Sequence, residues 1–175
     1  MADGKTEKPL IGILMGSDSD LPVMVESAHT LEEFGIAHEM EVISAHRSPA
    51  RTHEYAVSAA ARGIRCIIVG AGGAAHLGGV VAALTTLPVI GVPMDTTALK
   101  GMDSLLSIVQ MPAGIPVATM AIGKPGAVNA AIFAAQILGL SDAAIHSRLD
   151  KHKEKLAASV TEKNARLKEK LSKKD

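Results

Sequence analysis

The sequence predicts an α/β fold, in which a five-stranded parallel sheet is covered by helices on both faces. Short apolar runs alternate along the chain with longer segments whose apolar residues recur at helical spacing, as in a parallel sheet with crossover helices. Hydrophobic residues make up 47% of the chain, yet it has no Trp, one Tyr and two Phe. The core must therefore be built from small and branched aliphatic side chains, which suits buried parallel strands. The length of 175 residues is that of one domain.

The predicted strands are short apolar runs, most of which end at a turn rich in glycine, proline or polar residues. The first is apolar throughout, as expected of a strand buried on both faces. Pro93 ends the fourth. The five predicted strands span residues 10–15, 40–43, 66–69, 89–92 and 117–122.

The predicted helices begin and end at residues that favour helix termini. Ser48 is placed as the N-cap of the second helix, Pro49 is its first residue, and Gly63 ends it. Gly35 and Gly139 stand at the ends of two other helices. The predicted helices that alternate with the strands span residues 21–34, 49–62, 80–84, 103–110 and 125–138.

The last stretch, residues 141–175, predicts one long helix that packs against another surface. It holds ten Lys or Arg against six Asp or Glu. Its apolar residues recur with an eleven-residue period, which gives one narrow apolar stripe. A neighbouring subunit is a natural partner for that stripe, whereas the interleaved acidic residues argue against a nucleic-acid arm. The apolar residues of the stripe are Ile145, Leu149, Leu156, Val160, Leu167 and Leu171.

Composition excludes several classes of function. The formal net charge is zero, so no overall field attracts the chain to nucleic acid or to a membrane surface. Base stacking has almost no aromatic side chains to use. The single Cys66 cannot form an internal disulfide. Residues 1–9 are short and polar, without the apolar segment of a signal peptide, and no apolar stretch is long enough to span a membrane. We expect a soluble cytoplasmic protein with an extended or disordered N-terminus over residues 1–9.

Polar and glycine-rich turns follow the first three predicted strands, on the carboxyl edge where an open α/β sheet binds ligands. The turn at residues 16–20 offers backbone amides, two hydroxyls and a helix N-terminus, which suit a phosphate, although an ordinary capped turn would explain it as well. The turn at 43–49 holds Ser44, His46 and Arg47. Its imidazole can move protons near neutral pH and its guanidinium can bind an anion, unless both are simply solvated.

The third turn, residues 70–79, has five glycines, which allow the backbone to approach a ligand closely. Gly70, Gly72 and Ala75 also match a loose dinucleotide fingerprint, with Asp95 after the next strand. That match favours an oxidoreductase. However, the fingerprint normally occupies the first strand–helix turn, and its acidic residue lies about 20 residues on.

Other catalytic motifs are missing from the sequence. There is no P-loop, no metal-binding histidine pair on a helix and no Gly-x-Ser-x-Gly elbow. Proton transfer and electrostatics remain, with His46 and His76 as the available imidazoles in the three turns. We therefore expect no metal site.

Taken together, the three turns resemble the family of N5-carboxyaminoimidazole ribonucleotide mutases of purine biosynthesis, the class I PurE family. The likeness runs in order over about residues 9–150. It is carried by Gly16-Ser17-x-Ser19-Asp20, Ser44-Ala45-His46-Arg47-x-Pro49, Ala71-Gly72-Gly73-Ala74-Ala75-His76-Leu77, Asp103-Ser104-Leu105, Ser107-Ile108-Val109-Gln110-Met111-Pro112, Pro116-Val117-Ala118-Thr119, Ala121-Ile122-Gly123 and Asn129-Ala130.

The resemblance implies a flavodoxin-like three-layer sandwich with strand order 2-1-3-4-5, so that the first and third turns flank the crevice. It implies one catalytic domain over residues 1–175. It also implies a homo-octamer with active sites at subunit contacts, in which the helix of residues 141–175 packs on neighbouring subunits. No metal or organic cofactor is implied.

The resemblance further implies an isomerase that moves a carboxylate from the exocyclic nitrogen of an aminoimidazole ribonucleotide to ring carbon 4, through carbon dioxide held in a closed pocket. His46 would be the general acid and base. The glycine loop would hold the carbon dioxide or carboxylate away from water. His76 would position the carboxylate or cap the following helix. The substrate-binding residues by this resemblance are Ser17, Ser19, Asp20, Ser44, Arg47, Gly72, Gly73, Ala74, His76 and Leu77.

Two positions depart from the family pattern: Leu21 replaces an aromatic residue, and Gly78 replaces a proline, which should loosen that loop. Two alternatives within the fold stay open. One is the related class that carboxylates free aminoimidazole ribonucleotide with carbon dioxide, although the intact Gly-Gly-Ala-Ala-His run favours the mutase. The other is a nucleotide-binding scaffold without catalysis.

Overall fold

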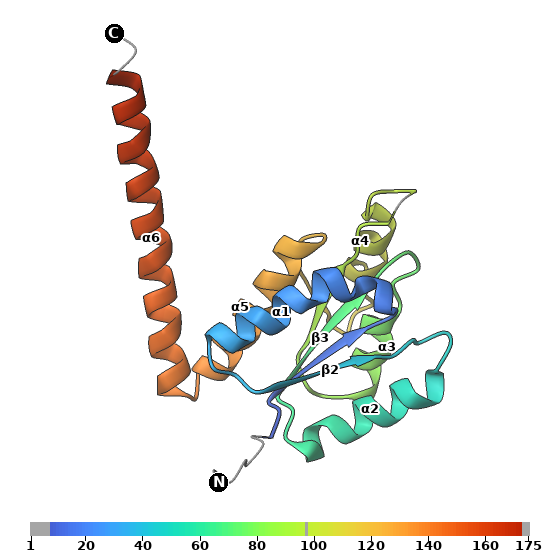
Figure 1. Cartoon of the computed structure of the whole chain (residues 1–175). Coiled ribbons are helices and arrows are strands. Elements are labelled where there is room, and N and C mark those ends of the chain that lie inside the picture. The colour runs from blue at the N-terminus through green and yellow to red at the C-terminus, as the bar shows by residue number, and fades with distance from the viewer. Residues whose placement is uncertain (1–7, 97, 173–175) are drawn as a thin grey trace, which may run out of the picture.

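The computed structural model describes residues 8–96 and 98–172, and it confirms the predicted α/β class (Figure 1). All strand pairs are parallel, and their order in the sheet is β2-β1-β3-β4-β5. This is the flavodoxin-like order implied by the resemblance. The strands are β1 (Ile11–Met15), β2 (His38–Val42), β3 (Cys66–Ala71), β4 (Val89–Pro93) and β5 (Ala118–Thr119).

Helices follow the strands as the sequence predicts. The second helix has the predicted bounds, because Pro49 fits its first turn and Gly63 ends it with a φ of +107°, which favours glycine. A short 3₁₀ turn, η1 (Asp18–Asp20), precedes the first. The helices are α1 (Leu21–Glu33), α2 (Pro49–Arg62), α3 (Leu77–Leu84), α4 (Met102–Val109), α5 (Lys124–Gly139) and α6 (Ala143–Ser172).

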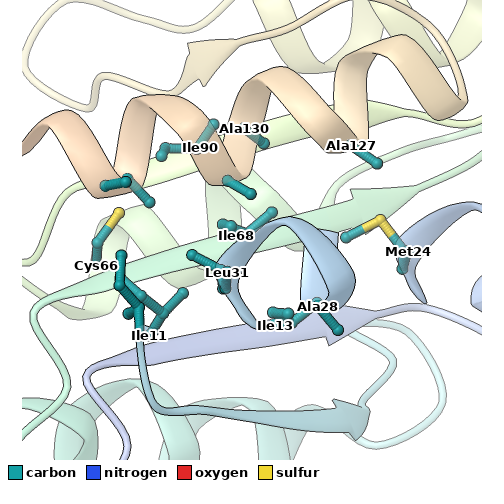
Figure 2. Close-up of a cluster of buried hydrophobic side chains, with 14 of the residues drawn as sticks. Ile11, Ile13, Met24, Ala28, Leu31, Cys66, Ile68, Ile90, Ala127 and Ala130 are labelled. Atoms are coloured by element: carbon teal, nitrogen blue, oxygen red, sulfur yellow. The ribbon is translucent and has the colours of Figure 1, made fainter. Parts of the chain in front are cut away.

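One face of the sheet is covered by α1 and α5, and Figure 2 shows the core between them. The face of α5 toward α1 is made of alanines, so the two helices can approach closely, and the larger Met24 and Leu31 of α1 fill the space above the sheet. The two helices are also joined by a hydrogen bond, because the buried Ser27 hydroxyl donates to the Ala127 carbonyl at 2.8 Å.

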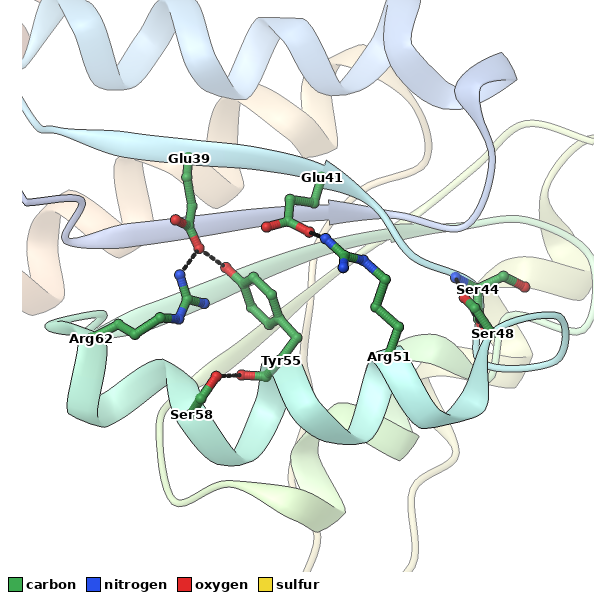
Figure 3. A network of polar contacts seen from close by, with 8 residues as sticks. All are labelled: Glu39, Glu41, Ser44, Ser48, Arg51, Tyr55, Ser58 and Arg62. Carbon is green, nitrogen blue, oxygen red and sulfur yellow. Dashed lines mark hydrogen bonds and ion pairs between the residues drawn. The ribbon is translucent and has the colours of Figure 1, made fainter.

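The other face is covered by α2, α3 and the inner side of α4. On it, Tyr55 of α2 lies over Gly12 of β1 and donates a hydrogen bond to Glu39 at 2.7 Å. Arg62 pairs with the same carboxylate at 2.6 Å, and Arg51 pairs with Glu41 at 2.5 Å (Figure 3). Burial raises the pKa of Tyr55, so its hydroxyl stays protonated and remains a donor. This network fixes α2 to β2, the strand that leads into the turn with His46.

Three details differ from the sequence expectation. The third helix begins at Leu77 rather than at residue 80, and it includes Gly78, which is buried within it. β5 is an edge strand of two residues, although the Met120 N–H still bonds the Gly91 carbonyl beyond it. Ser48 occupies the N-cap position of α2, but its hydroxyl bonds the Ser44 backbone and does not cap the helix.

The long C-terminal helix is present as α6, which extends away from the body of the molecule (Figure 1). The apolar stripe divides into two parts. Ile145 is buried and Leu149 half-buried against the body, whereas Leu156, Val160, Leu167 and Leu171 are 50–65% exposed. Within the described ranges, no helix has the length and apolar character needed to cross a membrane. The expectation for the N-terminus falls mostly on residues 1–7, outside the described residues.

Candidate active site

A cleft of about 690 Å³ lies at the carboxyl ends of the strands, where the first three turns come together. This is the switch point of the sheet, since β1 and β3 are neighbours and their connections leave in opposite directions. A fourth segment, after β4, completes the wall. The lining residues are Gly16, Ser17, Ser19, Asp20, Ser44, Ala45, His46, Arg47, Ala71, Gly72, Ala74, His76, Leu77, Met94, Asp95 and Thr96.

The first turn has fewer free amides than the sequence suggested. Ser17 caps η1 by accepting from the Ser19 N–H at 3.3 Å, and the Asp20 N–H bonds the Ser17 carbonyl at 3.2 Å. The Gly16 N–H bonds the Gly70 carbonyl, which continues the β1–β3 ladder. The bonds that the Ser17 and Ser19 hydroxyls donate are long, 3.2 and 3.5 Å to the neighbouring carboxylates, so both hydroxyls can donate to a ligand instead.

Asp20 is a partly buried carboxylate at the mouth of this turn. Burial raises its pKa above the ordinary value, while hydrogen bonds to Ser17 and Ser19 and the positive charge of Arg47 oppose the rise. It makes no side-chain bond to the end of α1, so it does not cap that helix. A carboxylate held in this way can accept hydrogen bonds from hydroxyl groups of a ligand.

The second turn is held rigid by its own side chains. The Ser44 hydroxyl accepts from the Arg47 N–H at 3.1 Å, and the Ser48 hydroxyl bonds both the N–H and the carbonyl of Ser44 at 3.0 Å. The Arg47 guanidinium crosses to the first turn, where Nη2 donates to the Gly16 carbonyl at 2.8 Å. Arg47 therefore places a positive charge between the two serine-bearing turns.

His46 and His76 meet across the cleft. The Nε2 atom of His46 lies 2.9 Å from the Nδ1 atom of His76, and the rings are nearly perpendicular, with an interplanar angle of 79°. One of these nitrogens must carry the proton while the other accepts it. His76 stands at the N-cap position of α3 but makes no capping bond, so its side chain is committed to the cleft. The pair forms a short path for a proton between two exposed imidazoles.

The glycine loop contributes some, but not all, of its predicted residues to the cleft. Gly72, Ala74 and Leu77 line it, whereas Gly73 does not. The Gly73 N–H points to the buried Ser104 of α4, at 3.0 Å from its Oγ. This contact joins two segments 31 residues apart and was not foreseen from the sequence.

The segment after β4, where Met94, Asp95 and Thr96 line the cleft, was not predicted from the sequence as part of the site. Asp95 was considered only as the possible acidic residue of a dinucleotide site. A signal was available, because every parallel strand of the sheet ends at the same edge. Among the described residues, no group of three or more His, Cys, Asp and Glu side chains is arranged to hold a metal ion.

Comparisons with known proteins agree on one family. The AIR carboxylase family model matches residues 10–159. The N5-carboxyaminoimidazole ribonucleotide mutase of Pyrococcus horikoshii is 59% identical over 165 residues, covering 94% of this chain and 92% of that protein. The phosphoribosylaminoimidazole carboxylase of Candida albicans is 60% identical over 136 residues, or 78% of this chain and 24% of that protein. The crystal structure of Treponema denticola PurE has a TM-score of 0.83 at 29% identity, covering 91% of this chain and 99% of that one. The chain therefore belongs to the AIR carboxylase family.

Proposed function

We propose that this chain is an isomerase of purine biosynthesis that converts N5-carboxyaminoimidazole ribonucleotide to the 4-carboxy isomer. The observation that carries the proposal is the His46–His76 pair, 2.9 Å apart, in a cleft whose other walls carry Ser17, Ser19 and Arg47. The reaction needs a proton donor and acceptor at one place, beside sites for a phosphate and a carboxylate. The name and the high identity of the Pyrococcus horikoshii relative support the same reading.

Each wall of the cleft suits one part of the substrate. We assign the phosphate and ribose to Ser17, Ser19 and Asp20, because the two hydroxyls can donate to phosphate and the carboxylate can accept from ribose hydroxyls. Arg47 lies between the first two turns and neutralises an anionic group, while Ser44 orients it. The carboxylate faces the glycine loop at Gly72 and Ala74, next to His76 and Leu77. Gly73 supports that loop from behind.

In this reaction His46 gives up a proton in the first step and takes one back in the second. His46 donates a proton to the exocyclic nitrogen as the C–N bond breaks and carbon dioxide is released. Ring carbon 4 then attacks the carbon dioxide, forming the C–C bond, and its hydrogen leaves as a proton to His46. The catalyst is thereby restored and no net proton is consumed. His76 can share the proton between the two steps, because its Nδ1 is within hydrogen-bond distance of His46.

The loose dinucleotide fingerprint has a structural explanation that needs no cofactor. Gly70 belongs to β3, and a Cβ there would lie 2.5 Å from the Met24 sulfur, so packing under α1 requires the glycine. Ala75 is buried. Two of the three fingerprint positions therefore serve the core, and we propose a reaction without an organic cofactor.

We further propose a cytoplasmic homo-octamer in which α6 packs on neighbouring subunits. The exposed half of the apolar stripe, Leu156 to Leu171, supports an assembly, since four large apolar side chains on one helix have no partner within the described part of the chain. A cleft at a subunit contact would receive further walls from that partner and become closed to water.

One alternative has a specific observation in its favour. The Candida albicans relative is named a carboxylase, and it shares 60% identity with this chain over 136 residues. The same cleft could then bind the free aminoimidazole ribonucleotide and carbon dioxide. In that case only the second half of the chemistry would take place on the protein.

Turnover of the two candidate substrates distinguishes these readings. Purified protein is given the N-carboxylated ribonucleotide without bicarbonate, or the free ribonucleotide with bicarbonate, and formation of the 4-carboxy product is followed. Product from the first supports the mutase, product only from the second supports the carboxylase, and product from neither refutes the proposal. His46→Asn should lower kcat by about 10²–10⁴-fold with bound ligand retained, while His29→Asn, on the exposed side of α1, is the matched control.

A further inference from the structure

Ser104 lies outside the cleft, yet it is joined to the loop that lines it. It is completely buried, in the first turn of α4, and its Oγ accepts a hydrogen bond from the Gly73 N–H at 3.0 Å. A fully buried hydroxyl makes such a bond in place of water and loses it only at a substantial penalty. The contact is therefore a fixed point of the glycine loop.

The bond fixes the orientation of one peptide unit. Gly73 has a φ of +62°, a backbone angle that favours glycine. A Cβ on it would meet nothing within 4 Å, so lack of space is not the reason for a glycine here. In a trans peptide the N–H of one residue and the carbonyl of the preceding residue point in opposite directions. With the Gly73 N–H directed inward to Ser104, the Gly72 carbonyl is directed away from Ser104.

The rest of the loop follows from that orientation. The Gly73 carbonyl accepts from the Ala75 N–H at 2.9 Å, and the Ala74 carbonyl accepts from the His76 N–H at 2.8 Å. These two tight turns lead directly to His76, whose ring meets His46. No hydrogen bond between described residues uses the N–H of Gly72 or of Ala74, and both residues line the cleft. The Gly73 N–H thus points inward to Ser104, whereas the N–H groups of Gly72 and Ala74 are available to a ligand.

The residue before Ser104, Asp103, is bonded to the segment after β4. The Thr96 hydroxyl lies 2.7 and 2.9 Å from the two carboxylate oxygens of Asp103. Hydrogen bonds from Thr96 and, to a smaller extent, from Ser104 hold the pKa of Asp103 below its ordinary value. A Cβ on Gly72 would lie 3.4 Å from the Thr96 methyl group, so the glycine loop and the segment after β4 are in direct contact. The first turn of α4 therefore contacts two neighbouring walls of the cleft, the segment after β4 through Asp103 and the glycine loop through Ser104.

We propose that Ser104 is a positioning residue, which sets the glycine loop so that the Gly72 and Ala74 amides face the migrating carboxylate and the carbon dioxide formed from it. This inference rests on the proposed function. In this arrangement the two amides retain carbon dioxide between the two steps of the reaction. When retention fails, the C–N bond has broken, carbon dioxide leaves, the amine keeps the proton received from His46, and water returns a proton to the histidine.

The test measures the partition of the N-carboxylated substrate. Ser104→Ala should raise the fraction that ends as free aminoimidazole ribonucleotide and carbon dioxide, relative to 4-carboxy product, by about five- to thirtyfold. The decarboxylation without protein is subtracted, and KM should stay within about twofold, because the phosphate and ribose contacts remain. A merely structural role would reduce the active fraction of protein without changing this ratio.

Matched variants control for volume and folding. Ser104→Thr keeps the hydroxyl and should restore the wild-type ratio, Ser104→Cys keeps the size with a weak acceptor and should resemble alanine, and Ser107→Ala on the same helix should change nothing. Hydrogen–deuterium exchange is measured on the peptide covering residues 70–76, and should rise in Ser104→Ala only there.

Two results would overturn the inference: a wild-type ratio in both Ser104→Ala and Ser104→Cys, or faster exchange throughout the chain. If the wild-type protein acts on neither substrate, the proposed function fails by itself. Exchange at residues 70–76 then still decides whether Ser104 holds the loop: a local rise in the alanine variant supports the contact, and an unchanged rate refutes it.

Discussion

Gly12→Ala provides a quantitative test of how β1 packs on α2. A Cβ at Gly12 would lie 2.1 Å from the Tyr55 hydroxyl oxygen and 3.2 Å from ring atom Cζ, so the tyrosine must move. Its hydroxyl would then leave Glu39, 2.7 Å away, and its ring would shift beneath the Arg62 guanidinium, now 4.6 Å from the ring centroid. Overpacking and the lost bond to a carboxylate together should lower the free energy of unfolding by about 2–4 kcal/mol.

A second substitution separates the clash from other effects. Tyr55→Phe removes the atom that clashes and should by itself lower the free energy of unfolding by about 1–2 kcal/mol, because Glu39 keeps its ion pair with Arg62. In the double variant the hydroxyl oxygen is gone, and the atom closest to the new methyl group is the ring atom Cζ. The two changes should therefore be non-additive, with a coupling of about 1–2 kcal/mol in the stabilising direction.

Urea unfolding followed by far-ultraviolet circular dichroism is the appropriate assay, since the chain has no Trp for fluorescence. All variants are compared at one protein concentration, because any assembly adds to apparent stability. If the two substitutions add, or if the double variant is less stable than Gly12→Ala, the packing described for Tyr55 is wrong.

Three other predictions concern separate parts of the molecule. Burial raises the pKa of Cys66 to about 12, so a thiol reagent at pH 8 should label the protein only in denaturant, and rapid labelling of the native form would contradict this. Burial also raises the pKa of Asp20, so its ionised form opposes folding at pH 7. Asp20→Asn should increase Tm at pH 7, and the gain should vanish below about pH 3, where the wild-type carboxyl is protonated in both folded and unfolded states. If Asp20→Asn does not raise Tm at pH 7, this prediction is wrong. On α6, Val160→Glu with Leu167→Glu should reduce the assembly size measured by light scattering, whereas Thr161→Glu, off the stripe, should not; equal sizes would exclude the stripe as an interface.

The fold could be predicted closely wherever one residue type dictates the backbone. Pro49 and Gly63 determine both ends of α2, because one fits a first turn and the other a left-handed residue. Gly78 misled the prediction, since glycines in sequence suggest a loop, while here one is buried within α3 beside Val117. The apolar run at residues 117–122 predicted a strand of that length, but only Ala118 and Thr119 of it form β5 at the edge of the sheet.

The candidate site was predictable as three turns but not as a set of contacts. His46 and His76 are 30 residues apart, and only the register of β1 between β2 and β3 brings their turns together. Ser104 belongs to a segment that carried the family likeness, Asp103-Ser104-Leu105, but nothing in that segment indicated a contact with the glycine loop, because a serine in the first turn of a helix is ordinary. Its role depends on the tertiary position of Gly73, which no periodicity encodes.

The separation of α1 and α5 along the chain has a consequence for biosynthesis. Ser27 meets Ala127, 100 residues later, and Phe34 meets Arg148, 114 residues later. At roughly 5–20 residues per second, the apolar face of α1 leaves the ribosome roughly 5–20 seconds before the helix that covers it. During that interval Met24 and Leu31 cannot pack against α5, the helix beside α1 on the same face of the sheet. A nascent chain arrested before residue 124 should therefore bind a holdase chaperone, and the full chain should release it once α5 has left the ribosome.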